Sequence, residues 1–85
     1  MKIEISKQIV NGNNGSYNPE TQTIRIYPKR NKLMMLETLR HEITHYICHA
    51  RNINSAQHGI AFQHCYYSFC TQILVDEYKS IITNH

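Results

Sequence analysis

The chain carries the segment LETLRHEITHYICHA at residues 36–50, and the rest of the sequence is easiest to interpret around it. Apolar residues recur in this segment at intervals of three and four, namely Leu36, Leu39, Ile43, Ile47 and Ala50. This spacing is typical of one face of an α-helix. The segment therefore predicts an amphipathic helix with one buried apolar side.

The same segment contains the pattern His-Glu-x-x-His, formed by His41, Glu42 and His45. Residues four apart on a helix lie about 6 Å apart along its axis, so two imidazoles at this spacing can bind one Zn²⁺. At about 100° per residue, both histidines point nearly opposite the apolar face. Glu42 is placed to act as general base on a water molecule. We therefore expect two zinc ligands and a catalytic glutamate here; the simpler alternative is a surface helix with two solvated histidines.

Length and composition restrict the class of protein. Eighty-five residues form one domain, residues 1–85, whose core is small, and a bound metal is a common way to stabilise such a fold. There is no run of about 18 apolar residues and no apolar signal-peptide segment at the start, so we expect no membrane partner. Three cysteines without framework spacing argue against a disulfide scaffold and favour a reducing, cytoplasmic location.

The charge balance is mildly basic, with a net charge of +3. This charge permits contact with nucleic acid but does not require it. The basic segment KRNK at residues 29–32 could contact phosphate, although a solvated loop is the simpler explanation.

Three segments before the helix have the composition of short β-strands. Residues 2–10 carry Ile3, Ile5 and Ile9 at even spacing, although the last two would also suit a short helix. Residues 16–18 follow a turn-rich loop, and residues 23–27, TIRIY, alternate and are rich in β-branched side chains. With a turn at residues 18–21, NPET, these segments predict a small antiparallel sheet of two or three strands whose isoleucine face packs on the helix.

A second helix is predicted at residues 59–82, after asparagines and a serine at residues 52–55 end the first. Its apolar stripe consists of Phe62, Tyr66, Phe69 and Ile73, widened by Cys70, Leu74 and Ile81. The predicted fold class is therefore α+β: a small antiparallel sheet packed on the His-Glu-x-x-His helix and a second, C-terminal helix.

A catalytic zinc needs a third protein ligand and an open position for water. We prefer His58, which opens the second helix, as this ligand. Gly59 beside it would allow close approach of the backbone, and Phe62 would anchor the new helix in the core. Asp76 or Glu77 remains an alternative carboxylate ligand.

Two further histidines are less suitable as ligands. His49 lies about 12 Å along the helix axis from His41, too far for both to share one metal with His45. His64 lies on a different face of the second helix from His58.

The segment LETLRHEITH at residues 36–45, followed by HGIAF at residues 58–62, resembles the SprT-like (Spartan) metallopeptidase domain. That family pairs a Glu-Thr-Leu lead-in to His-Glu-x-x-His with a later His-Gly-x-x-Phe. The likeness extends over about residues 3–62, because GSY at residues 15–17 and IRI at 24–26 also resemble strands of its sheet. The resemblance implies a minimal zincin fold, with His41, His45 and His58 as zinc ligands and Glu42 as general base. The family's usual first helix and its frequent cysteine zinc ribbon are not recognised in these residues.

These observations predict a zinc metallopeptidase that hydrolyses peptide bonds of a protein or peptide substrate. One alternative is a non-catalytic binding module that zinc stabilises through the same ligands. Another is a basic nucleic-acid-binding protein without a metal.

Cysteines and tyrosines near the motifs allow two interpretations each. We expect inert core positions for the cysteines, with a structural His/Cys zinc site between the helices as the alternative for Cys48, Cys65 and Cys70. We expect core or rim positions for Tyr46, Tyr66 and Tyr67. A tyrosine from the second helix could instead donate a hydrogen bond to an oxyanion.

Overall fold

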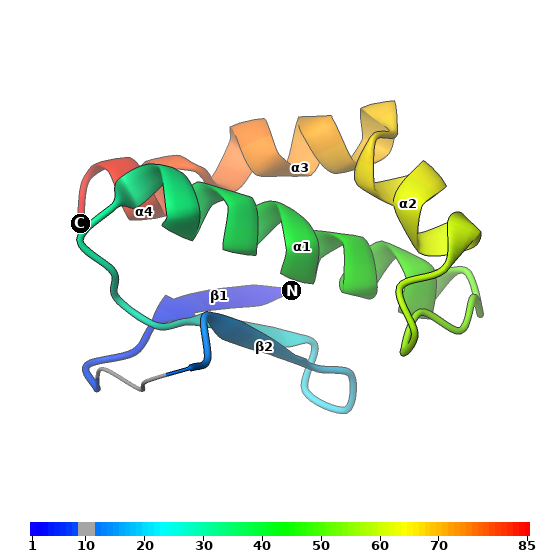
Figure 1. Ribbon diagram of the computed structural model, residues 1–85, viewed down its shortest axis with the longest axis horizontal. Coiled ribbons are helices and arrows are strands. Elements are labelled where there is room, and N and C mark those ends of the chain that lie inside the picture. The colour runs from blue at the N-terminus through cyan, green and yellow to red at the C-terminus, as the bar shows by residue number, and fades with distance from the viewer. Residues whose placement is uncertain (9–11) are drawn as a thin grey trace.

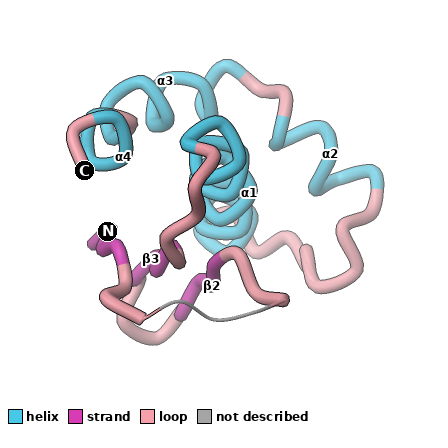
Figure 2. Tube along the Cα trace, turned by 60° about the vertical axis from the view of Figure 1, so that its left-hand side comes forward, coloured by secondary structure: helices cyan, strands magenta, loops and turns pink. Residues whose placement is uncertain are grey.

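The computed structural model describes residues 1–8 and 12–85. Within these residues, the strands and helices follow one another as β1 Lys2–Ile5, β2 Gly15–Asn18, β3 Thr23–Ile26, α1 Lys32–Ala50, α2 Ile60–Tyr66, α3 Phe69–Tyr78 and α4 Ser80–Thr83. The long helix α1 lies between the sheet and the other helices (Figure 1). Figure 2 looks nearly along α1 and shows the strands below it and α3 and α4 above it. The protein is therefore a small α+β fold organised around its central helix.

The sheet is mixed, with the strand order β1-β3-β2. β2 pairs with β3 in the antiparallel direction, whereas β1 pairs with β3 in the parallel direction. The prediction of a purely antiparallel sheet is therefore wrong for β1. The cause is the strand order: β3 turns back from β2 and takes the place between β1 and β2, where its neighbour β1 runs the same way.

β2 and β3 agree with the sequence, whereas β1 is shorter than predicted. β2 and β3 lie within one residue of the predicted segments, and the Asn18 side chain orders the turn between them by accepting a hydrogen bond from the Glu20 backbone N–H at 2.9 Å. β1 ends at Ile5, so the prediction of a strand over residues 2–10 is wrong for residues 6–8, which are described and are not part of a strand. The later part of that segment, Ile9 and Val10, lies outside the described residues.

The core lies between the sheet and α1. Ile24 and Ile26 of β3 are fully buried and belong to one cluster with Leu39 and Ile43 of α1. Burying each such side chain contributes about 1.5–3 kcal/mol. The predicted isoleucine face is confirmed, and Leu39, Ile43 and Ile47 of the predicted apolar face of α1 are buried. Ala50 at the end of that face is exposed, and the prediction of a single buried side is wrong because helices cover α1 opposite the sheet. Cys48, outside the predicted stripe, is also fully buried because α2 and α3 cover α1 on its other side.

Side chains of the basic segment fix the start of α1. The Asn31 side-chain oxygen caps the helix by accepting from the backbone N–H of Leu33 at 2.9 Å and of Met34. The Lys32 ammonium group donates to the carbonyl of Thr83 at 3.1 Å and so ties this helix start to α4. Two of the four residues at 29–32 therefore have structural roles.

The prediction of one helix over residues 59–82 is wrong, because Ser68 divides it. Its hydroxyl donates to the carbonyl of Cys65 at 2.7 Å, which ends α2, and accepts from the Thr71 backbone N–H at 3.3 Å, which caps α3. The chain therefore leaves α2 and starts a new helix with a different phase.

The change of phase alters which side chains are buried. Phe69 and Ile73 of the predicted stripe are 80% and 54% exposed, whereas Thr71 and Val75 are buried against the rest of the molecule. A helical pattern continued across Ser68 thus predicts the wrong face for α3.

Candidate metal centre

The structure brings His41 and His45 of α1 together with His58, which lies just before α2. One ring nitrogen from each lies within 4.8 Å of the other two. The Nε2 atoms of His45 and His58 are 3.0 Å apart. Nitrogens bound to a tetrahedral zinc are about 3.3 Å apart. Small rotations of the side chains would therefore bring the three nitrogens to metal-binding geometry, and the cluster is close enough to hold a metal ion.

A reversal of the chain after α1 brings His58 back to the two helical histidines. Asn52 adopts φ 57°, and the N–H of Ile53 donates to the carbonyl of Cys48 at 2.8 Å. With the bond from the Asn52 N–H to the carbonyl of His49, this is a Schellman motif, in which a left-handed residue ends the helix. His58 itself has φ 53°, a conformation uncommon outside glycine, so its backbone is held in a strained form beside the cluster.

The side chain of Phe62 in α2 packs against all three histidines of the cluster. Its ring centroid lies 5.0, 4.9 and 4.8 Å from those of His41, His45 and His58. The side chain is 5% exposed, so the prediction that it anchors α2 in the core is confirmed. This packing restricts the orientation of all three imidazoles.

Gly59 does not have the role expected from the sequence. A Cβ atom there would meet nothing within 4 Å, so no close approach of the backbone requires a glycine. The close approach is at Gly15 of β2, where a Cβ would lie 2.6 Å from the Thr38 methyl group and 2.9 Å from the carbonyl oxygen of Arg25. Glycine at this position lets β2 lie directly against α1 beside Glu42.

Ser55 is a site residue that the sequence did not identify. Its hydroxyl lies 2.8 Å from Nδ1 of His45. With the proton on Nδ1 donated to this hydroxyl, the lone pair of Nε2 points toward the other two histidines. The only signal in the sequence is a hydroxyl residue in the loop before His58, which turn composition explains equally well.

Glu42 is a buried carboxylate, 6% exposed. Among the described residues, no hydrogen bond or ion pair engages it. Burial raises the pKa of Glu42 to about 7. A buried acid that lacks a partner and titrates near neutrality is the kind of group that active sites use for proton transfer.

Two cavities of about 380 Å³ each meet at Glu42. The first extends along α1 past His41, and its wall includes Gly15, Glu37 and Tyr66. The second extends past His45 toward the Schellman turn, and its wall includes Tyr17, His49, Ile53 and Ser55. Glu42 thus lines both the cavity beside His41 and the cavity beside His45.

Burial also acts on the histidines. Burial, together with smaller contributions from the neighbouring rings of His41 and His58, lowers the pKa of His45 to about 4. Burial likewise lowers the pKa of His41, with a smaller contribution from His58. Both effects favour neutral imidazoles, which is the form that binds a metal.

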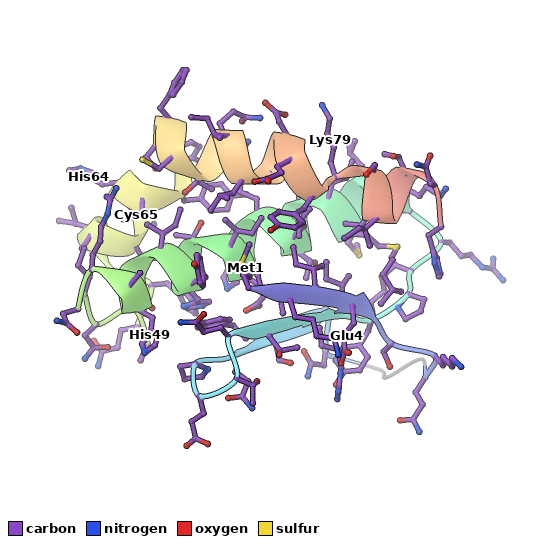
Figure 3. All side chains as sticks on the ribbon, turned by 180° about the vertical axis from the view of Figure 1, so that it is seen from behind. Met1, Glu4, His49, His64, Cys65 and Lys79 are labelled. Carbon is purple, nitrogen blue, oxygen red and sulfur yellow. The ribbon has the colours of Figure 1, made fainter. Side chains whose placement is uncertain are left out.

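The other candidate ligands lie elsewhere. Nδ1 of His49 is 3.3 Å from the Tyr17 hydroxyl, and His64 is exposed on the outer side of α2, away from His49 (Figure 3). Asp76 accepts hydrogen bonds from Gln72 and Lys79 on the far part of the helical layer, and Glu77 is exposed. Neither carboxylate belongs to the histidine cluster.

Cysteines and tyrosines divide by position. Cys48 and Cys65 are buried as expected for core residues, whereas the expectation is wrong for Cys70, which is exposed on α3. Within residues 1–8 and 12–85 no cysteine joins the histidine cluster. Tyr67 is 79% exposed and Tyr46 is half-buried. Tyr66 lies in the wall of the first cavity with His41 and Glu42.

Comparisons with known proteins return no match among family models, curated proteins or solved structures. The interpretation of the site therefore depends on its own geometry and chemistry. In the part of the chain that the structure describes, no helix has both the length and the apolar character needed to span a membrane.

Proposed function

We propose that this protein is a zinc-dependent metallopeptidase of the SprT-like type, which hydrolyses peptide bonds in proteins or peptides. One observation carries the proposal. Three ring nitrogens lie within 4.8 Å of one another, and the buried carboxylate of Glu42 faces the same cavities without a partner among the described residues.

The donor set suits a catalytic zinc. His41, His45 and His58 would hold the ion through neutral imidazole nitrogens, and no fourth His, Cys, Asp or Glu among the described residues joins them. Three protein ligands with an open position are typical of catalytic sites, whereas structural zinc sites have four. When bound, zinc supplies a Lewis acid that polarises a carbonyl group and makes water more acidic.

Glu42 supplies the proton transfers. Its carboxylate removes a proton from the attacking water and returns that proton to the leaving amine. The pKa of about 7 suits a group that must accept and release a proton in one cycle. Gly15 contributes indirectly: without a side chain, β2 can lie against Thr38 of α1, and a Cβ at this position would be within ordinary contact distance, 3.6 Å, of the Glu42 side chain.

The shape of the site suits an extended peptide. β2 is an edge strand, and its residues Gly15 and Tyr17 lie in the walls of the two cavities that meet at Glu42. An edge strand can add a peptide as a further strand through main-chain hydrogen bonds. A peptide bound along β2 would pass the histidine cluster and place one of its carbonyl groups there.

The decisive test is Glu42→Gln, which keeps the size of the side chain but removes its basicity. We expect the zinc-loaded variant to fold and to retain its metal, while peptide hydrolysis falls at least about 100-fold. Glu77→Gln, an exposed change on α3, is the matched control and should retain full activity. Hydrolysis should be followed with casein and a broad peptide library. If wild type and Glu42→Gln both bind zinc and neither shows activity, a zinc-stabilised binding module is the better description.

A further inference from the structure

The cavity on the His41 side of Glu42 contains a second carboxylate, that of Glu37. Glu37 lies one helical turn before His41 and is exposed. The remaining wall is mostly polar and includes the amide side chains of Asn13 and Asn14, with Met34 as its apolar part. Among the described residues that line this cavity there is no lysine or arginine, so its fixed charge is negative.

No cation of the described chain neutralises Glu37. It forms no ion pair among the described residues. Arg40, one turn further along α1, points toward α2 and α3 instead: its guanidinium donates to the carbonyl of Tyr66 at 2.9 Å and to the side-chain oxygen of Gln72. The Glu37 carboxylate therefore remains available to a ligand in the cavity.

A second acidic side chain, that of Glu42, lines the same cavity. Glu42 is only 6% exposed, and no described residue forms a hydrogen bond or an ion pair with its carboxylate. The negative charge of Glu37 also acts on Tyr66. Burial is the main cause that raises the pKa of Tyr66; Arg40 opposes the increase, and Glu37 adds to it. Glu37, Tyr66 and Glu42 thus face one common volume.

We propose that Glu37 makes this enzyme prefer substrates with a cationic group, ammonium or guanidinium, in the cavity beside His41. The inference rests on the proposed peptidase function. The carboxylate would pair with the cation, the amide oxygens of Asn13 and Asn14 would accept its remaining hydrogen bonds, and Met34 would contact an aliphatic stem.

Helix geometry sets where the cation lies along the substrate. One helical turn separates Glu37 from His41, or about 5–6 Å, whereas an extended peptide advances about 3.3 Å per residue. The cation is therefore carried one or two residues from the peptide bond held at the histidine cluster. A lysine or arginine side chain fits this distance, and so does the free amino group of a substrate N-terminus.

The test uses the zinc-loaded Glu42→Gln variant as a non-cleaving form and fluorescent peptides that differ at one position beside a fixed central bond. Lys, Gln or Glu occupies that position, on either side of the bond, with the N-terminus either acetylated or free. We expect the best Lys peptide to bind about fivefold more tightly than its Glu counterpart, since exposed ion pairs are weak. Adding Glu37→Lys should reverse the preference, and adding Glu77→Lys, a matched exposed change, should not.

The possible outcomes separate this inference from the proposed function. Cleavage by wild type without any charge preference, or a Lys preference that survives Glu37→Lys, overturns the inference and leaves the peptidase intact. Binding that depends on a free N-terminus and on Glu37 supports it, with the amino group as the cation. If no peptide binds, the inference is wrong. If peptides bind with the expected preference but wild type cleaves none, the peptidase proposal is wrong.

Discussion

The hydroxyl of Ser55 lies 2.8 Å from Nδ1 of His45, on the opposite side of the ring from Nε2, which faces His58. A histidine ligand commonly uses its second ring nitrogen to donate to such a partner, which fixes the tautomer and the ring orientation. We therefore expect Ser55 to act as a positioning residue for the candidate metal centre, through its contact with His45.

The first prediction concerns this contact. Ser55→Ala should weaken zinc binding about 10-fold to 100-fold, because His45 loses the partner that orients it. A competition titration with a chelating dye measures the change. Ser55→Thr keeps a hydroxyl and should retain most of the affinity, and Ser80→Ala, on α4, should have no effect. Equal affinities for wild type and Ser55→Ala would show that the hydrogen bond does not support the site.

Metal removal should destabilise the whole protein. A fold of 85 residues has a small core, and an ion that binds only the native state adds about 2.7 kcal/mol at 100 times its dissociation constant. In a domain of this size that corresponds to about 10–20 °C in the thermal midpoint. Calorimetry with and without chelator measures the shift.

Histidine variants identify where the stabilising ion binds. His41→Ala, His45→Ala and His58→Ala should each lower zinc content sharply and abolish most of the response to chelator. His64→Ala, an exposed change outside the cluster, should behave as wild type. If His58→Ala retains its full metal content but Asp76→Ala or Glu77→Ala loses it, the third ligand lies on α3 instead.

The sequence predicts those parts of this protein that depend on short-range geometry. The spacing of His41, Glu42 and His45 within one helix fixes their relative positions, because a helix has a single rise and a single angle per residue. The turn at residues 18–21 and the buried isoleucines of β3 are local in the same sense. The prediction of His58 as third ligand depends on the pairing of the His-Glu-x-x-His motif with the later His-Gly-x-x-Phe motif. The geometry of the loop before His58 could not be predicted from hydrophobic periodicity.

The features that were missed depend on long-range packing. Alternation identifies a strand but carries no information about strand order, so the parallel pairing of β1 with β3 was not predicted. Apolar residues continue past Ser68, so the hydrophobic pattern hides the cap that divides the second helix. Ser55 reaches His45 only because the chain reverses direction at Asn52, which has a positive φ. The backbone N–H groups of Asn52 and Ile53 hold this reversal by donating hydrogen bonds to carbonyls at the end of α1.

The close contact at Gly15 gives a steric prediction. Gly15→Ala would place a methyl group 2.6 Å from the Thr38 methyl and 2.9 Å from a backbone oxygen of β3, so β2 must move away from α1. We expect a loss of about 1–3 kcal/mol in the free energy of unfolding by urea, the usual result of overpacking. Gly59→Ala, where the added atom meets nothing within 4 Å, is the control.

A partner substitution tests the cause of that loss. Thr38→Ser removes the methyl group that the new side chain would meet, so the double variant Gly15→Ala/Thr38→Ser should recover part of the stability. Recovery should be incomplete because the contact with the Arg25 carbonyl remains. If Gly15→Ala is as stable as wild type, β2 does not lie against α1 as closely as the structure indicates.

The last prediction concerns pH in the metal-free protein. Burial raises the pKa of Glu42 from its ordinary value of 4.5 to about 7, so between these pH values the native state binds more protons than the unfolded state. Stability contributed by protonated Glu42 is therefore present at low pH and is lost as pH rises through this range. Glu42→Gln should match wild type below about pH 4.5 and exceed it by about 1–2 kcal/mol above pH 7, after allowance for solvent in the cavities. Glu77→Gln should show no such divergence. Urea unfolding in chelator at several pH values measures the difference, and a constant offset between wild type and Glu42→Gln would mean that burial does not perturb this carboxyl group.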